Sequence, residues 1–456
     1  MHKIPRGLDL PIAGKPAPRV EEGRGVGQVG ITATDFPLMK PRMHVNVGDT
    51  VARGQLLFED RKGEGVLFTS PAAGTVSAIN RGAKRALQSV VIELSDAERA
   101  GQGDHVTFEH YQGKAVADMD GTEVRALLSE SGLWTSFRTR PFGRVPNVTD
   151  KPASIFVTAM DTNPLAGSVD ACLQALGEEH FKTGLTALKT LTEGKVWLCK
   201  GAGTPVPAVD GIHVEEFKGK HPAGLPGTHI AWLDPVGREH TVWHLGYQDV
   251  WAIGALLATG QLDVTRIIAL GGPTVKNPRL IRARLGVSLS ELTAGELVAD
   301  RESRVISGSI LSGRQMDGEH WNFLGRYHTQ VSVIPEDRER VFFGWLRPGL
   351  NKFSTIRAFA SGWLGMGKRT REFNTNTNGS HRAMVPIGMF ERVMPLDIMP
   401  TFLLRALVVD DVENAEKLGC LELDEEDLAL CSFVSPGKED YGKALRRNLD
   451  EIWREG

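Results

Sequence analysis

The sequence is poor in cysteine and has no long apolar run, and each absence excludes a class of protein. Only four of its 456 residues are cysteine, too few for a disulfide framework, so we expect reduced thiols and a cytosolic protein. No apolar stretch approaches the ~20 residues that a membrane-spanning helix requires. Residues Met1–Asp9 carry charges without an apolar core, which is unlike a secretion signal. The sequence therefore predicts a soluble protein with no transmembrane segment of its own.

The chain also lacks an excess of either charge and a clear metal-binding pattern. Its 53 basic and 56 acidic side chains nearly balance, so no long-range attraction to nucleic acid or acidic lipid is expected. Five histidines could suggest a metal site. Their spacing, however, places no three on one face, and no carboxylate or cysteine lies at ligand spacing from them. They are predicted to be hydrogen-bonded loop residues, and no metal ligand is assigned: His213, His221, His229, His240 and His244.

The length indicates about three domains, and the first is a small β barrel. Residues 1–33 are rich in glycine and proline without a clear period, which predicts an extended N-terminal arm. Residues 34–102 hold short β runs broken by Gly-Asp, Gly-Gln and Pro-x-x-Gly turns, the pattern of a flattened barrel. The order V-x-V-G-D-x-V-x-x-G-Q-x-L, then S-P-x-x-G-x-V, resembles the biotinyl/lipoyl carrier fold. Carriers of this fold modify a lysine within Met-Lys-Met, whereas Lys62 has no methionine neighbours, so we interpret the barrel as a structural reuse.

Residues 103–260 alternate helical and strand patterns, which predicts a Rossmann-like α/β domain. A helix capped by Thr122 is expected to end at Gly132, and a buried strand near residues 154–158 follows the basic loop 133–144. A later helix, with Val250 and Leu256 on one face, should end near Gly260. Nucleotides bind at such loops, outside the carboxyl ends of strands, and a phosphate cradle there needs glycines. Bulky side chains occupy those positions here, so we interpret the loop as a filled pocket: Trp134, Phe137, Arg138 and Phe142.

The rest of the chain predicts a β-grasp module, an irregular stretch and a helical end. Residues 261–314 contain a hairpin, a helix with Leu289 and Leu292, and a further strand, which is the β-grasp order. Residues 315–376 are aromatic-rich without a period and are interpreted as an irregular connecting region. Residues 377–456 carry three sets of apolar residues at helical spacing, so a C-terminal helical domain is expected. The sequence as a whole predicts a multi-domain α/β protein.

The order of these parts is similar to that of respiratory electron-transfer subunits. It resembles the C subunit of the Rnf electron-transport complex and, from the α/β domain onward, the NADH-binding flavoprotein subunit of respiratory complex I. The stretches Ile4–Gly14, Gly219–His229 and Arg382–Gly388 look most like the A subunit of the sodium-translocating NADH:quinone oxidoreductase (NQR) complex. This resemblance covers essentially the whole chain and implies an SLBB-like β-grasp module.

The chain departs from its flavin- and cluster-binding relatives at their redox sites. They carry Gly-Leu-Arg-Gly-Arg-Gly-Gly-Ala-Gly-Phe-Pro, or a similar string, where this chain has residues 132–142. They also carry an acidic Asn-Ala-Asp-Glu stretch at the next strand end, where only Asp161 remains. The Rnf subunit has the tail spacing C-x2-C-x2-C-x3-C-P, whereas here Cys431 is followed by Ser435 and a proline. We therefore expect no flavin and no iron–sulfur cluster bound by this chain.

The resemblance implies a peripheral subunit on the cytoplasmic face of the bacterial inner membrane. The complex would reduce ubiquinone with NADH and pump sodium, as an NADH:ubiquinone reductase and translocase, and the isolated chain is expected to be inactive. FAD, FMN, riboflavin and Fe–S centres would belong to the other subunits of the NQR complex, which are the expected partners together with ubiquinone. A quinone site needs an apolar slot with one or two hydrogen-bond donors. The residues assigned to it are Phe36, Leu38, Met39, Trp134, Phe137, Arg138 and Phe142.

Three other interpretations stay open from the residues. The chain could be an electron carrier of the Rnf kind with a flavin or Fe–S centre, although loop 132–144 and Ser435 argue against it. It could carry a prosthetic group on Lys62, or serve purely as a scaffold for the membrane subunits. For any single candidate aromatic residue, packing in the core or against a partner subunit is the favoured explanation. The sequence does not separate a scaffold from a quinone-binding subunit, since both need an exposed apolar and basic surface.

Overall fold

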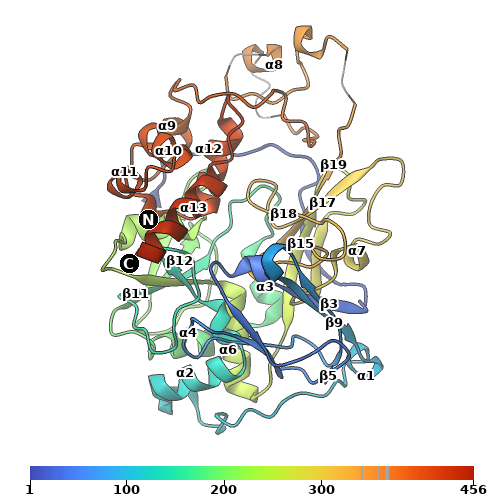
Figure 1. Ribbon diagram of the computed structural model, residues 1–456, viewed down its shortest axis with the longest axis vertical. Helices are drawn as coiled ribbons and strands as arrows, with labels where there is room; N and C mark the ends of the chain where they lie inside the picture. The colour runs from blue at the N-terminus through green and yellow to red at the C-terminus, as the bar shows by residue number, and fades with distance from the viewer. Residues whose placement is uncertain (340–341, 357–358, 365–368, 456) are drawn as a thin grey trace.

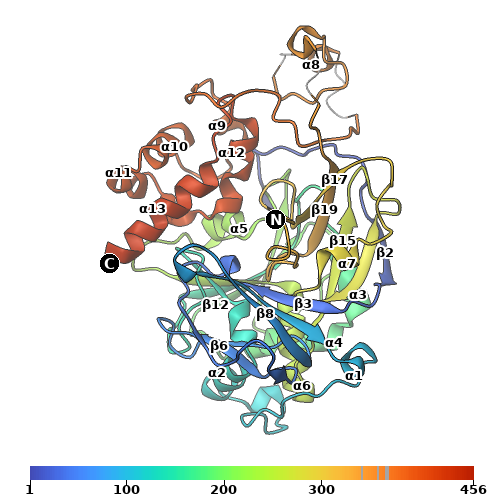
Figure 2. The same ribbon diagram turned by 45° about the vertical axis from the view of Figure 1, so that its right-hand side comes forward.

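The computed structural model describes residues 1–339, 342–356, 359–364 and 369–455, and these form four parts (Figures 1 and 2). An N-terminal β sandwich and an α/β domain share one apolar core. A second six-stranded sheet lies beside them, and the C-terminal helices build a core of their own. The candidate site lies where the first three parts meet.

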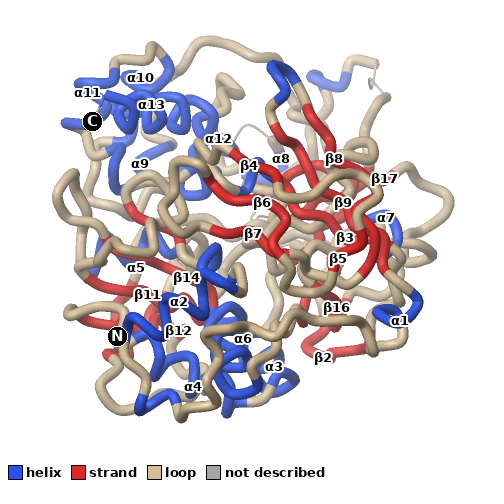
Figure 3. The backbone as a smooth tube through the Cα atoms, turned by 60° about the horizontal axis from the view of Figure 1, so that its bottom comes forward, coloured by secondary structure: helices blue, strands red, loops and turns tan. Residues whose placement is uncertain are grey.

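The N-terminal part is a sandwich of two antiparallel sheets, in which the sheet order is β3-β9-β8-β5 on one side and β4-β6-β7 on the other (Figure 3). Alternate side chains such as Val76, Val90 and Ile92 are fully buried, as expected for strands with one face on a core. Lys62 lies in the turn between β6 and β7 and is exposed. The strand bounds are β3 Gln28–Thr32, β4 Pro41–Met43, β5 Thr50–Val51, β6 Leu56–Asp60, β7 Leu67–Thr69, β8 Gly74–Arg81 and β9 Leu87–Leu94, and the short helix α1 follows at Asp96–Arg99.

Residues 1–33, interpreted as an extended arm, contribute strands to three sheets. β1 (His2–Lys3) pairs in parallel with β13 (His213–Lys218) of the α/β domain. β2 (Ala17–Glu22) pairs in parallel with β16 (Arg279–Arg284) of the second sheet, and β3 belongs to the sandwich. The sandwich therefore begins before residue 34. Pairing with the edge of a sheet stabilises an extended segment, because the edge strand satisfies the backbone N–H and C=O groups of the segment.

The α/β domain is built on four parallel strands in the order β13-β12-β11-β14, which is 3-2-1-4 when they are numbered along the chain. This is part of the order of a doubly wound sheet. β1 extends one edge, and β10 joins the other edge antiparallel to β14. The bounds are β10 Arg138–Arg140, β11 Ser154–Ala159, β12 Lys195–Gly201 and β14 Val242–Gly246.

Helices cover both faces of this sheet. Ile155 and Val157 of β11 pack with α3, α4 and α6 on one face, and Phe156 packs with α5 on the other. α4 and α6 cross closely because both carry glycine at the contact: a Cβ on Gly254 would lie 1.7 Å from a main-chain oxygen of α4. The bounds are α2 Gly121–Glu130, α3 Val169–Leu176, α4 Glu178–Leu188, α5 Pro226–Leu233 and α6 Tyr247–Thr259.

Two helix ends compare directly with the sequence prediction. α6 ends at Gly260, which has a positive φ of 71°, as its spacing predicted. α2 is capped by Asp120 and not by Thr122, because the carboxylate of Asp120 accepts the N–H groups of Thr122 and Glu123 at 2.8 and 2.9 Å. Glu123 reaches back to the N–H of Asp120, which completes a capping box.

The second sheet has the order β18-β17-β19-β15-β16-β2. β15 and β16 form the predicted antiparallel hairpin. β19 lies in the stretch 315–376, interpreted as irregular, yet it is fully buried and runs parallel to β15 in the middle of the sheet. The bounds are β15 Thr265–Gly271, α7 Leu289–Leu292, β17 Ser303–Ser307, β18 Arg314–Gln315 and β19 Gln330–Pro335.

The C-terminal part is helical and packs around Leu403, Leu407, Leu445 and Leu449, all fully buried. Asp424 caps the short 3-10 helix Glu425–Leu428. Helix α8 lies apart from this cluster, at the tip of the molecule above β19 (Figures 1 and 2). The bounds are α8 Ala360–Trp363, α9 Phe390–Val393, α10 Pro400–Val408, α11 Val412–Lys417, α12 Ala429–Val434 and α13 Tyr441–Glu455.

Candidate functional site

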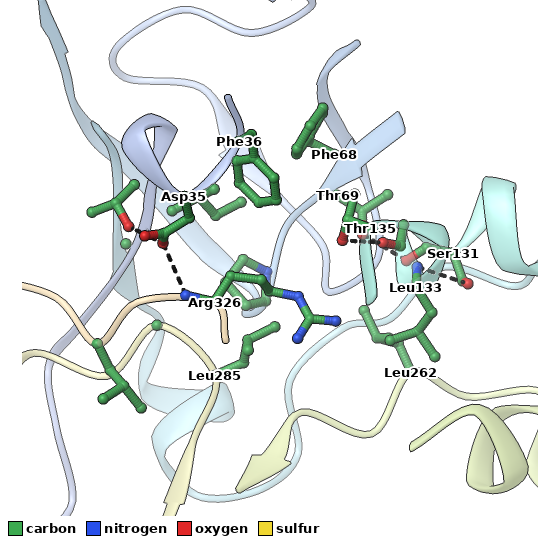
Figure 4. Close-up of a pocket in the computed structure, with 17 residues that line it drawn as sticks. Asp35, Phe36, Phe68, Thr69, Ser131, Leu133, Thr135, Leu262, Leu285 and Arg326 are labelled. Atoms are coloured by element: carbon green, nitrogen blue, oxygen red, sulfur yellow. Dashed lines mark hydrogen bonds between the residues drawn. The ribbon is translucent and has the colours of Figure 1, made fainter. Parts of the chain in front are cut away.

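A cavity lies where the sandwich, the α/β domain and the second sheet meet (Figure 4). Its volume is about 50 Å³. That space holds a few water molecules and is well below the roughly 300 Å³ of the smallest typical ligand pockets. The lining residues are Gly30, Ile31, Thr32, Asp35, Phe36, Phe68, Thr69, Pro71, Ser131, Gly132, Leu133, Thr135, Leu262, Leu285, Gly286, Leu324 and Arg326.

The walls of the cavity are mainly apolar and aromatic. Phe36 meets Phe68 edge to face, with ring centres 4.7 Å apart, and lies 6.0 Å from the ring of Tyr327 in a similar arrangement. Edge-to-face contacts of this kind are favourable for aromatic rings. Aliphatic side chains complete the walls, namely Leu133, Leu262, Leu285 and Leu324. A flat apolar ring is the ligand chemistry that these walls would favour.

Two threonine hydroxyls at the cavity are hydrogen-bonded to the turn that follows α2. Thr69 donates to the carbonyl oxygen of Ser131 at 2.7 Å, and Thr135 donates to that of Gly132 at 2.8 Å. A ligand carbonyl would have to compete with these main-chain acceptors for the two protons. The hydroxyl oxygens themselves remain able to accept a hydrogen bond.

Arg326 and Asp35 join the three parts of the molecule at the cavity. The guanidinium of Arg326 donates to Asp249 at 2.8 Å and to Ser136 at 2.7 Å, and its backbone N–H donates to Asp35. Burial alone raises the pKa of Asp35, but the ion pair with Arg314 at 2.9 Å and further hydrogen bonds outweigh it, so the pKa is lowered. Sequence reasoning missed this group, because Arg314 and Arg326 lie 279 and 291 residues from Asp35 along the chain.

The structure separates the candidate quinone residues. Phe36 lines the cavity. Leu38 has a positive φ of 59° in the turn after it, and Met39 packs partly buried against the sandwich core. Trp134 and Phe137 are fully buried, and Trp134 donates its indole N–H to the carbonyl of Pro146 at 2.8 Å. These two rings are core residues behind the cavity wall.

Arg138 and Phe142 point toward different neighbours. The guanidinium of Arg138 lies 4.4 Å from the ring centre of Tyr327, a cation–π contact next to Phe36. Phe142 contacts the ring of Trp453 in α13, with centres 5.2 Å apart. The seven candidates therefore do not form one site: Phe36 lines the cavity, Arg138 is linked to it through Tyr327, and Phe142 belongs to the contact with the C-terminal helices.

The loop interpreted as a filled pocket is closed by acidic residues of the C-terminal part. Arg140 is fully buried and donates to Asp427 at 2.8 Å, with Asp424 and Glu426 at 3.7 and 3.5 Å. Burial opposes the charge of Arg140, but the three carboxylates raise its pKa above the ordinary value. Burial alone raises the pKa of Asp424, but the charges of Arg140, Arg446 and Arg138 hold it well below its usual range. Acidic side chains of the C-terminal part thus neutralise the buried Arg140 of this loop.

Three of the five histidines predicted to lie in loops are in regular elements instead: His213 in β13, His229 in α5 and His244 in β14. His229 is fully buried and hydrogen-bonds the carbonyl of Ala223 at 3.0 Å, and burial lowers its pKa to about 3. His221 bonds Thr162, and burial lowers its pKa to about 4. The four cysteines are free thiols buried in the fold. Within the described ranges, no three histidine, cysteine or acidic side chains come close enough to share a metal ion.

Family models match three of these parts. The NqrA N-terminal barrel-sandwich hybrid domain matches residues 2–95, the NqrA second alpha/beta domain matches 119–262, and the NQRA C-terminal domain, of SLBB type, matches 267–318. Fold and matches together define a multi-domain α/β subunit of a quinone reductase complex.

Full-length relatives make the assignment more specific. The chain is 55% identical to the A subunit of the Na(+)-translocating NADH-quinone reductase of Actinobacillus succinogenes, 53% to that of Cellvibrio japonicus and 51% to that of Neisseria meningitidis, covering 100% of both chains in each pair. The chain belongs to this family, the A subunits of Na(+)-translocating NADH-quinone reductases. It is one subunit of a translocase complex, and the other subunits of that complex are its partners.

Solved structures add no further argument. A crystal structure of an NAD+-reducing [NiFe]-hydrogenase is 14% identical and covers 50% of this chain and 49% of its own, with a TM-score of 0.35. That likeness is too weak to carry a statement about fold or function. Among the helices in the described part of the chain, none is both long and apolar enough to cross a membrane.

Proposed function

We propose that this subunit holds no redox cofactor, sits on the cytoplasmic face of the membrane subunits and contributes to quinone binding at the cavity beside Phe36. The observation that carries the quinone proposal is the meeting of Phe36 with the turn 131–135 at one apolar cavity. Both stretches were candidates from the sequence, and they lie about a hundred residues apart. The relatives belong to NADH-quinone reductases, and this supplies the substrate class, a quinone.

Quinone entry requires the cavity to open. At about 50 Å³ the space is too small for a substituted ring, so Phe36 or Phe68 must move aside. Both rings lie at a junction between parts of the molecule, where side-chain rearrangement disturbs no strand pairing. The hydroxyls of Thr69 and Thr135 line the cavity and would have to leave their main-chain acceptors to donate to a ring carbonyl. The quinone ring would then replace the edge-to-face contact between Phe36 and Phe68 with contacts of its own.

The absence of a redox cofactor is proposed from packing in the loop 132–144. A flavin there would have to displace Trp134 and Phe137 from the core and break the ion pair of Arg140 with Asp427. Breaking a buried ion pair is costly because each charge is left without its partner. The residues present therefore do not fit a flavin at this loop.

The quinone proposal is tested by changing Phe36 to leucine in the assembled complex. F36L keeps the apolar volume but removes the ring contacts, so the KM for ubiquinone is expected to rise about tenfold with a smaller change in kcat. Labelling by a photoreactive ubiquinone analogue should fall in parallel. F402L, at an exposed position on α10, is the matched control and should behave like the unchanged complex. An unchanged KM, or labelling that misses residues 30–36 and 131–135, would contradict the proposal.

A purely structural role is the second candidate, and one observation favours it. The polar groups around the cavity already have partners within the chain, as expected of a packed junction. For a scaffold, F36L would leave the KM for ubiquinone unchanged while the complex assembles normally.

The cofactor proposal has an independent test. The chain purified alone under reducing, anaerobic conditions is expected to be colourless in the visible range and free of iron. Near-stoichiometric flavin or iron–sulfur bands would instead favour an electron carrier of the Rnf kind.

A further inference from the structure

The segment made of residues 342–356 and 359–364 projects from the body of the molecule at its helix α8, while Phe353 packs against Phe373 and against Phe433 of α12, with ring centres 5.4 and 6.2 Å away. It follows β19, and its helix α8 lies at the tip in both ribbon views (Figures 1 and 2). Large apolar side chains are exposed along it, with Phe342 82% and Leu364 61% accessible. The exposed apolar residues of this segment are Phe342, Phe343, Leu346, Leu350, Ile356, Trp363 and Leu364. Such concentrations on a surface mark a contact with a partner or a membrane.

The sequence around this segment carries positive charge only. Although the whole chain is nearly balanced, the sequence from Arg340 to Arg371 contains seven arginines and lysines and no aspartate or glutamate. Among them, Arg347 and Arg369 are exposed, and Lys352 lies 5.4 Å from the ring centre of Phe359. The overall balance that argued against acidic lipid therefore hides a local basic region.

Exposed aromatic and aliphatic side chains together with basic ones are the composition of segments that lie in a membrane interface. The apolar side chains enter the boundary of head groups and acyl chains, and each nearby Lys or Arg adds attraction to anionic lipid. Tryptophan is favoured at that depth because its ring is amphipathic. None of the described helices could span the bilayer, so the contact would be with its surface.

A second exposed apolar surface shows that exposure alone does not indicate lipid. On α10, Met399, Phe402 and Val409 are exposed by 58%, 58% and 73%. This surface borders Asp410 and Asp411 and has mixed charge. An anionic membrane would repel those carboxylates, whereas the tip segment offers it only positive charge.

We propose that the segment of residues 342–356 and 359–364 binds the surface of an anionic membrane, with its apolar side chains in the interface and its basic side chains on lipid phosphates. This goes beyond the proposed function, since lipid binding at the tip and quinone binding at the cavity can each hold without the other. The protein thereby gains a direct lipid contact in addition to its contacts with other subunits.

The test is flotation of the purified full-length chain with vesicles of phosphatidylcholine and phosphatidylglycerol. Binding is expected at low salt, is expected to weaken as salt rises, and should be absent with phosphatidylcholine alone. The double variant Phe342→Ser with Leu346→Ser should bind roughly tenfold more weakly, as should Arg347→Glu with Lys352→Glu. The matched control, Met399→Ser with Phe402→Ser, removes two equally exposed apolar side chains and should bind like the unchanged chain.

Several results would overturn the proposal. They are failure to float with anionic vesicles, equal binding to neutral vesicles, or unchanged binding by both tip variants with melting temperatures that match the original chain. Capture by detergent-solubilised membrane subunits through the tip, without vesicle binding, would show a protein-binding segment instead. The two proposals are told apart by the KM for ubiquinone of the tip variants in the assembled complex. An unchanged KM leaves the quinone proposal standing even if the tip binds no lipid.

Discussion

Two stretches of this chain have similar composition and opposite surroundings. Residues 133–144 and residues 342–364 each contain three basic side chains, several aromatic ones and no acidic residue. In the first, Trp134, Phe137 and Arg140 are completely buried. In the second, large apolar side chains such as Phe342 face solvent. Composition alone therefore does not determine whether an aromatic and basic stretch becomes core or surface.

The difference comes from partners supplied elsewhere in the chain. β10 pairs with β14 and carries Arg140 into the interior, where Asp427 meets it from the C-terminal part. A buried arginine is tolerated only with such a partner. Among the described residues, no carboxylate pairs with Arg347 or Lys352. Within the described part of the chain, Arg347 and Lys352 of the tip segment thus lack the kind of acidic partner that Asp427 provides for the loop 133–144.

The largest effect is expected when Arg140 loses its acidic partner. Asp427→Asn keeps the shape but leaves the buried guanidinium of Arg140 without its closest carboxylate, so unfolding in urea should show a loss of about 3–5 kcal/mol. Asp410→Asn is the control, because its ion pair with Arg447 is half exposed and its loss should cost at most about 1 kcal/mol. Equal effects of the two variants would mean that the loop is held by its aromatic side chains alone.

The ionisation of Glu426, next to Arg140, makes the stability of the folded chain depend on pH. Burial raises the pKa of Glu426 to about 7 in the folded chain, although Arg138 and Arg140 act in the opposite direction. Between pH 4.5 and 7 the folded chain then holds a proton that the unfolded chain has lost, so this group's contribution to stability falls as the pH rises. Glu426→Gln removes the titration, and its stability relative to the original chain should rise by roughly 1–3 kcal/mol from about pH 5 to about pH 8. Urea unfolding at both pH values measures this, and a pH-independent difference would mean that Glu426 is ionised throughout.

The smallest effect compares the same substitution in both stretches. Trp134→Phe removes the hydrogen bond to Pro146 and leaves space in the core, which should cost about 1–3 kcal/mol in urea unfolding. Trp363→Phe, at a side chain that is 68% exposed, should change stability by less than about 0.5 kcal/mol. A large effect at position 363 would show that the tip is packed more tightly than its exposure indicates.

Local signals in the sequence were sufficient for much of the fold. The turn pattern predicted the sandwich strands, the apolar run near Ile155 predicted β11, and Gly260 marked the end of α6. These elements depend on neighbours within a few residues, so their sequence carries the necessary information.

Features that depend on distant partners were not predictable in this way. β19 looked irregular because its burial on both faces leaves no alternating pattern. The pair of Arg140 and Asp427 joins residues 287 positions apart, and the contact of Arg326 with Asp35 joins positions 291 apart. The sequence predicted Phe36 at the candidate site but not Thr135 beside Trp134, and Leu324 and Arg326, which close the cavity, come from a stretch without any period.

The strands of the first residues have a consequence for the order in which the chain folds during synthesis. The sandwich can close once Leu94 has emerged from the ribosome, because β3 and β9 pair directly. β1 must wait for β13, and β2 must wait until β16 has been made, almost two hundred and sixty residues later. The strands β1 and β2 are therefore ordered long after they have been translated, and until then they remain open to pairing with other chains.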